Sequence, residues 1–110
     1  MAMALGVDML KHGTPEDWIT MYNGQGIGYA INTNDELQYL IQVARKTGIV
    51  LDPVYAGKAL IYFAKHLIKT FEPTDKVLFI HTGGTFGLYD KEEQLSALLP
   101  KEDIKPLNLE

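Results

Sequence analysis

The sequence predicts an α/β fold built around a parallel sheet, and three observations support that prediction. Two short apolar runs, Ile49-Val50-Leu51 and Val77-Leu78-Phe79-Ile80, are typical of strands buried on both faces of a parallel sheet. Each run leads into a turn and then into a segment whose apolar residues have helical spacing. The resulting order of strand, helix and strand is the one that a right-handed crossover joins in a parallel sheet.

Two short helices are expected before the first strand. Residues 2–10 are compatible with a helix that ends near Gly13. Thr14 is a suitable N-cap for a second helix that continues to about Met21. A glycine-dense loop follows over residues 24–28.

The segment 34–47 is predicted to be the best-defined helix of the chain. Thr33 and Glu36 have the three-residue offset of a capping box, and Gly48 supplies the C-terminal stop. One apolar stripe repeats at helical spacing and is expected to face the core. The stripe consists of Leu37, Leu40, Ile41 and Ala44.

Two more helices complete the predicted order of helix, strand, helix, strand, helix. They cover about residues 57–70 and 90–99, and the charged tail 101–110 is expected to be loosely held. Two strands alone do not make a stable parallel sheet, because both faces and both edges need cover. We therefore expect the domain to be larger than the 110 residues of this chain.

Composition excludes several classes of function. Hydrophobic residues make up 46% of the chain and the net charge is −4, so neither nucleic acid nor an anionic membrane is an expected partner. No apolar run approaches the roughly 20 residues that span a bilayer. The chain has no cysteine, and its three histidines lack the spacing of metal ligands, so no metal site is predicted. A cytoplasmic location is expected, and an organelle is also compatible.

Polar residues follow both predicted strands, and they define a candidate pocket. The first turn covers residues 52–58 and the second covers residues 80–85. In parallel α/β folds, ligands bind at the carboxyl ends of the strands, beside the free N–H groups of the following helices. The two turns are separated by one helix and one strand, so we expect them to lie side by side.

In the first turn, Tyr55 is the strongest candidate. Its phenol can act as an acid or base if its pKa is suitably lowered, or it can simply pack at a helix N-terminus. Asp52 precedes a proline, a position that more often organises a turn or caps a helix than performs catalysis. Lys58 can pair with a phosphate or carboxylate, or it can be a solvated side chain.

In the second turn, Thr82, Gly83 and Gly84 are the candidate binding residues. Adjacent glycines allow a backbone nest whose N–H groups face an anion or a heteroatom ring. The Thr82 hydroxyl can bond a ring nitrogen. A small phosphate-binding domain and a tight turn without a ligand are the alternatives, and His81 is equally compatible with packing and with catalysis.

Together the segments resemble the D-cysteine desulfhydrase and 1-aminocyclopropane-1-carboxylate deaminase family. Residues 48–59, GIVLDPVYAGKA, are similar to the family's first block, and residues 77–84, VLFIHTGG, are similar to its second. The match extends upstream to residues 26–32, GIGYAIN, and downstream to residues 87–91, GLYDK. It covers roughly residues 24–95.

The resemblance implies a pyridoxal 5′-phosphate (PLP) enzyme of fold type II, with a three-layer parallel-sheet domain. It implies a lyase or deaminase for a small amino acid, in first place a D-cysteine desulfhydrase that forms pyruvate, hydrogen sulfide and ammonia. Tyr55 matches the tyrosine beside the substrate, and Tyr29 replaces a second active-site tyrosine after a register shift. Thr82 matches the residue that bonds the pyridine nitrogen. Ala56 stands where the deaminase branch has a glutamate, which favours the desulfhydrase.

Residues 1–110 resemble only the C-terminal portion of that family. The family's cofactor-bearing lysine and its phosphate-binding loop lie in an N-terminal segment that this chain does not match, so the chain alone is expected to be inactive. The complete protein is expected to be a homodimer. A non-catalytic fragment that serves as an interaction module is the alternative. If the family reading holds, Tyr55 and Thr82 should face one aromatic ring, and residues 77–80 should lie in a parallel sheet.

Overall fold

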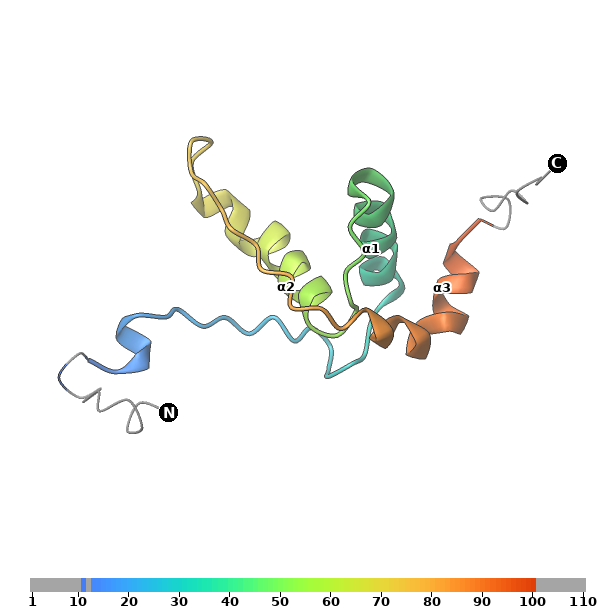
Figure 1. The fold of residues 1–110 in the computed structure, drawn as a ribbon, viewed down its shortest axis with the longest axis horizontal. Coiled ribbons are helices and arrows are strands. Elements are labelled where there is room, and N and C mark those ends of the chain that lie inside the picture. The colour runs from blue at the N-terminus through green and yellow to red at the C-terminus, as the bar shows by residue number, and fades with distance from the viewer. Residues whose placement is uncertain (1–10, 12, 101–110) are drawn as a thin grey trace.

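Three α-helices and several short helical turns form the chain in its computed structural model, which describes residue 11 and residues 13–100 (Figure 1). No β-strand occurs in that part of the chain. The elements in order are η3 (Pro15–Asp17), α1 (Asn34–Thr47), α2 (Ala56–Tyr62), η4 (Phe63–Leu67), η5 (Ile68–Thr70), η6 (Thr85–Lys91) and α3 (Glu92–Leu98). The helix predicted over residues 2–10 and the tail 101–110 lie outside the described residues.

Helix α1 forms as its sequence predicts. The Thr33 hydroxyl accepts the Glu36 N–H at 3.2 Å, and the Glu36 carboxylate accepts the Thr33 N–H at 3.0 Å, which completes the capping box. The helix ends at Gly48, whose φ of 74° is the left-handed conformation that glycine adopts most easily. Leu37, Leu40 and Ile41 are buried on one face of the helix.

The core lies between α1 and α2. Leu40 of α1 packs with Leu51, Ala56 and Ile61 in one buried cluster. Gly57 makes this close approach possible, because a Cβ atom there would lie 2.4 Å from the Asp52 carbonyl oxygen and 2.9 Å from the Leu40 methyl groups. Backbone atoms cannot give way at that distance, so only glycine fits between the two helices.

The other predicted helices are present but shorter or less regular. The helix predicted over 57–70 begins as α2, continues as the π-helical turn η4, and ends as the 3-10 turn η5. The helix predicted over 90–99 is α3, with the 3-10 segment η6 before it. The helix predicted from Thr14 to Met21 is reduced to η3, although Thr14 and Asp17 form its capping box.

The prediction of two strands in a parallel sheet is not confirmed in the described residues, where no strand is present. Residues 49–51 and 77–80 are irregular, and Leu78 is 85% exposed. A strand needs a neighbouring strand about 4.8 Å away to pair its backbone groups. In the described part of the chain residues 77–80 have no such neighbour, so the apolar pattern is present without the sheet that it requires.

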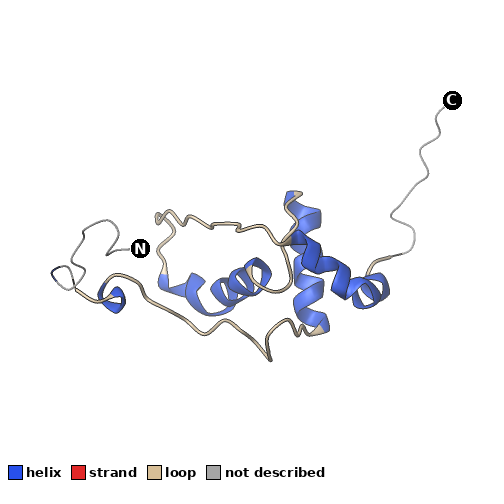
Figure 2. Cartoon of the chain, turned by 60° about the horizontal axis from the view of Figure 1, so that its bottom comes forward, coloured by secondary structure: helices blue, strands red, loops and turns tan. Residues whose placement is uncertain are grey.

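Helix α2 lies between two long irregular segments, one before α1 and one after η5 (Figure 2). The radius of gyration is 18.9 Å, whereas a compact domain of about 100 residues has about 13 Å. The core between α1 and α2 is therefore small relative to the chain, and many large apolar side chains stay exposed. Within the described residues, no helix is long and apolar enough to span a membrane.

Candidate functional site

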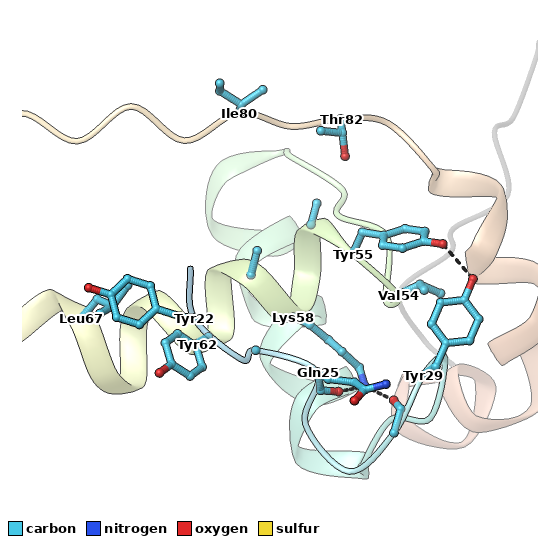
Figure 3. A pocket seen from close by; sticks show the side chains of 14 residues that line it. Tyr22, Gln25, Tyr29, Val54, Tyr55, Lys58, Tyr62, Leu67, Ile80 and Thr82 are labelled. Carbon is cyan, nitrogen blue, oxygen red and sulfur yellow. Dashed lines mark hydrogen bonds between the residues drawn. The ribbon is translucent and has the colours of Figure 1, made fainter. Parts of the chain in front are cut away.

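A cavity of about 700 Å³ opens between α2 and the two irregular segments (Figure 3). Three of the five predicted site residues line it, namely Tyr29, Tyr55 and Thr82. Gly83 and Gly84 stand in the same turn as Thr82 but are not among the lining residues. The remaining lining residues are Tyr22, Gly24, Gln25, Gly28, Val54, Ala56, Lys58, Ala59, Tyr62, Leu67 and Ile80.

Asp52 builds the first turn. Its carboxylate is 1% exposed and accepts three backbone N–H groups, from Val54 at 3.0 Å, Tyr55 at 2.6 Å and Ala56 at 2.9 Å. These are N–H groups at the start of α2 that have no partner within the helix. The turn-organising interpretation of Asp52 is therefore confirmed, and its three bonds fix the backbone of Tyr55 at the cavity.

The second turn packs directly against the first. Gly84 has a φ of 83°, and a Cβ atom there would lie 3.3 Å from Cγ of Asp52. A Cβ atom on Gly87 would similarly lie 3.7 Å from Val54. The two turns are thus side by side, as the sequence predicted, although no sheet joins them.

His81 links the two irregular segments. Its Nδ1 accepts the Gly83 N–H at 2.9 Å, so its Nε2 carries the proton and donates to the Val50 carbonyl oxygen, also at 2.9 Å. Its position in these bonds favours the packing interpretation of His81. The same contact uses the Gly83 N–H, which leaves the predicted anion nest with one donor fewer and weakens the phosphate-binding alternative.

Tyr29 and Tyr55 meet at the cavity wall. Their hydroxyl oxygens are 2.7 Å apart, and either can be the donor (Figure 3). The bond to Tyr29, the charge of Tyr29 when ionised, partial burial and the nearby Asp52 all raise the pKa of Tyr55 above its ordinary value of 10.0. The sequence interpretation made acid or base chemistry at Tyr55 depend on a lowered pKa, so the raised pKa is a correction. At neutral pH the Tyr55 phenol keeps its proton and can donate it.

The Thr82 hydroxyl points from the second turn toward α2, on the side of the cavity where Tyr55 lies (Figure 3). It makes no hydrogen bond within the described part of the chain. Tyr55 and Thr82 therefore share one cavity, and the Thr82 oxygen is available to a ligand there.

We expect the pKa of Tyr55 to lie above 10.0, and Tyr29→Phe to lower it toward that value. A raised folded-state pKa contributes stability that is fully present below the unfolded-state pKa and is lost as the pH rises through the folded-state value. A nuclear magnetic resonance pH titration of isotope-labelled tyrosine rings measures this directly. Tyr89→Phe, at an exposed tyrosine away from the cavity, is the matched control. Identical Tyr55 titrations in Tyr29→Phe and in the unmodified chain would contradict the prediction.

Lys58 corrects both sequence interpretations, because it neither is solvated nor faces an anion. It is 5% exposed, and its ammonium donates to the carbonyl oxygens of Gln25 at 2.5 Å, Gly28 at 2.6 Å and Ile31 at 2.7 Å. An ammonium has three N–H donors, and all three are used here. Lys58 therefore holds the glycine-dense loop that carries Tyr29.

Two aromatic residues of the cavity escaped the sequence interpretation. Tyr62 lies on α2, one helical turn after Ala59, and both residues line the cavity. The ring centroids of Tyr22 and Tyr62 are 5.8 Å apart. Tyr55, Ala59 and Tyr62 follow an i, i+4, i+7 spacing, which places them on one helix face and would have pointed to Tyr62. Tyr22 comes from a distant irregular segment and carried no such signal.

No cluster of three or more histidine, cysteine or acidic side chains that could hold a metal ion occurs in the described part of the chain. The residues with polar side chains that line the cavity are four tyrosines, Gln25, Lys58 and Thr82.

Comparison with known proteins matches the sequence of this chain to a family. The chain is 45% identical over 85 residues to the mitochondrial bifunctional D-cysteine desulfhydrase/1-aminocyclopropane-1-carboxylate deaminase of Arabidopsis thaliana, across 76% of the chain. The chain carries a segment of this enzyme family. It is also 44% identical over 72 residues to a candidate 1-aminocyclopropane-1-carboxylate deaminase of Thermotoga maritima, and 41% identical over 71 residues to one of Pyrococcus horikoshii.

The aligned segment covers only a fifth of each relative, namely 21% of the Arabidopsis protein and 22% of each of the other two. It covers 64% of this chain in both of those further alignments. No protein-family model matches the chain, and no solved structure matches it significantly.

Proposed function

We propose that residues 1–110 are the C-terminal part of a PLP-dependent lyase that converts D-cysteine and water to pyruvate, hydrogen sulfide and ammonia. The observation that carries the proposal is the pair of Tyr29 and Tyr55 hydroxyls, 2.7 Å apart, in a segment 45% identical to a D-cysteine desulfhydrase. The full domain is proposed to have fold type II, whose parallel sheet would include residues 49–51 and 77–80.

The cavity suits one end of the cofactor. The Thr82 hydroxyl is free to bond a pyridine nitrogen, and a hydroxyl, unlike a carboxylate, does not force that nitrogen to be charged. PLP, when bound, supplies the electron sink that makes the amino acid α-proton removable. Lys58 is the one lysine among the cavity-lining residues, and its three donors are committed to carbonyl oxygens, so it does not suit the covalent attachment.

Tyr55 is proposed to act as a proton donor. Its hydroxyl stays neutral at physiological pH, because the hydrogen bond to Tyr29 raises its pKa above 10.0. The sulfur leaves D-cysteine as HS⁻, which takes one proton to become hydrogen sulfide, and the neutral Tyr55 phenol at the cavity wall can supply that proton. Tyr29 holds the Tyr55 hydroxyl in place, and the α-proton taken from the amino acid balances the proton that Tyr55 gives up.

The alternative activity is that of a 1-aminocyclopropane-1-carboxylate deaminase, which appears in the names of all three relatives. Ala56 favours the desulfhydrase. Ala56 lines the cavity directly after Tyr55, and its backbone N–H donates to Asp52. Its methyl side chain offers no carboxylate to a ligand at that position. The family resemblance associates a glutamate there with the deaminase branch.

Assembly and location follow from the same proposal. We propose a homodimer for the complete protein, located in the cytoplasm or in an organelle, since the Arabidopsis relative is named as mitochondrial. The exposed apolar segments 49–50 and 77–80 also suit a non-catalytic interaction module.

A segment exchange tests the proposed activity. The 85 matched residues of the Arabidopsis relative are replaced by those of this chain, and hydrogen sulfide release from D-cysteine is assayed alongside deamination of 1-aminocyclopropane-1-carboxylate. We expect the chimera to release sulfide and the isolated 110-residue chain to be inactive. A folded chimera that binds PLP but eliminates nothing contradicts the proposal, and deamination alone would favour the alternative.

A further inference from the structure

The Lys58 ammonium makes three hydrogen bonds to the loop of residues 24–31, and the proposed chemistry assigns these bonds no role. The lysine starts on α2 and reaches carbonyl oxygens of three loop residues, Gln25, Gly28 and Ile31, at 2.5–2.7 Å. These are short distances, typical of charge-assisted hydrogen bonds, which are roughly twice as strong as neutral ones. One ammonium therefore binds backbone groups spread over seven positions of the loop.

Apart from Lys58, only single hydrogen bonds from described residues hold the loop: the Gln25 N–H donates to Asn23 Oδ1, Lys91 donates to the Ala30 carbonyl oxygen, and Tyr29 bonds Tyr55. Among the described residues its internal backbone bonding is limited to Ile31 N–H with the Gly28 carbonyl, a long contact at 3.3 Å. Gly26 and Ala30 both have positive φ, of 71° and 55°, and an alanine in that region is strained. A strained loop with so few bonds keeps one conformation only when an outside group holds it.

Tyr29 sits between two of the carbonyls that Lys58 binds, those of Gly28 and Ile31. Its hydroxyl meets the hydroxyl of Tyr55, the residue directly before α2 (Figure 3). Lys58 is three residues after Tyr55 on that same turn and helix. One helix thus presents the phenol and, through Lys58, aligns the loop that presents its partner.

We propose that Lys58 is a positioning residue, a tethered cation whose carbonyl contacts hold Tyr29 against Tyr55. This inference rests on the proposed function for its catalytic meaning, but the geometry it predicts exists without any turnover. Lys91 also binds the loop, through one hydrogen bond to the Ala30 carbonyl oxygen at 2.6 Å. A contact of one bond should matter less than a contact of three.

The test measures the Tyr29–Tyr55 contact in the 110-residue chain at neutral pH. The readouts are the nuclear Overhauser effect between the two rings, whose centroids are 6.1 Å apart, and hydrogen exchange at the Ile31 amide. We expect Lys58→Ala to abolish the ring contact and to accelerate Ile31 exchange about tenfold or more. Lys58→Met, which keeps the apolar stem, serves if the alanine variant does not fold, and Lys69→Met at an exposed lysine is the matched control.

Chemical rescue distinguishes a role for the positive charge of Lys58 from a role for the volume of its side chain. n-Propylammonium replaces the atoms that Lys58→Ala removes, and n-propanol has the same size without the charge. We expect the ammonium ion, and not the alcohol, to restore the ring contact. A folded Lys58→Ala or Lys58→Met chain that keeps the contact overturns the inference, as does equal rescue by both compounds. The proposed activity is judged separately by the segment exchange, so either idea can fail alone.

Discussion

Tyr55→Phe in the segment-exchange chimera should lower sulfide release from D-cysteine by about 100- to 10,000-fold, the usual loss when a positioned acid or base is removed. The substitution deletes one oxygen from a side chain that is 60% exposed, so packing should hardly change. What disappears is the proton held at the cavity wall and the 2.7 Å bond to Tyr29. The turnover rate under saturating D-cysteine measures the effect.

Two further variants define what Tyr55 does. Tyr29→Phe keeps the Tyr55 phenol but removes its partner, so we expect a smaller loss, about tenfold, and an alkaline limb of the pH profile that moves toward pH 10.0. Tyr89→Phe, at a tyrosine that is 74% exposed and stacked on Phe86, should leave the rate unchanged. Full activity in Tyr55→Phe would remove Tyr55 from the reaction and leave it as a packing residue.

Asp52→Ala should lower the free energy of unfolding by about 3 kcal/mol, because three N–H donors, one buried and two partly buried, lose their acceptor at about 1 kcal/mol each. The N–H groups belong to Val54, Tyr55 and Ala56 at the start of α2. A small folded unit has only about 5–15 kcal/mol in total, so this loss is large. Urea titration followed by circular dichroism measures it.

The matched controls for Asp52 are Asp52→Asn and Asp75→Ala. Asparagine keeps one acceptor oxygen and the shape of the side chain, so its loss should be intermediate. Asp75 accepts a single N–H, from Glu72 at 2.8 Å, in an exposed loop, and its removal should cost under about 1 kcal/mol. Equal losses at the two aspartates would mean that burial of the Asp52 network contributes nothing.

The effect of Asp52 should extend to the cavity. The second turn packs on this carboxylate through Gly84, so a collapsed first turn also displaces Thr82. Loss of stability and loss of cofactor affinity should therefore appear together in Asp52→Ala.

Local sequence signals predicted the parts of the fold that depend on neighbouring residues. Helix α1 has its capping box at Thr33 and its stop at Gly48 where the sequence places them, because both bonds join residues only a few positions apart. Asp52 was identified as a turn and cap residue for the same reason. The match to the family likewise depends on short contiguous blocks and holds at 45% identity.

The structure departs most from the sequence interpretation at residues 77–80. Their apolar pattern predicted a buried strand, and the family reading was expected to fail if they lay outside a sheet. They do lie outside one, yet the family match stands. An apolar run of this kind indicates a strand that other elements cover on both faces. The aligned segment is about a fifth of the relative's length, and the described residues supply no neighbouring strand for residues 77–80. The apolar pattern alone therefore could not produce the sheet.

The sequence by itself determined the boundaries of helix α1, the Asp52 cap and three of the residues that line the cavity, Tyr29, Tyr55 and Thr82. Only the tertiary structure decided that Tyr29 reaches Tyr55, that the shared hydrogen bond raises the pKa of Tyr55, and that Lys58 holds the loop between them. The partners in these contacts lie 26 to 33 positions apart in the chain. Residue spacing predicts contacts only between positions within one or two helical turns of each other. The bonds described here form because α2 packs against the glycine-dense loop, which comes from a distant part of the chain.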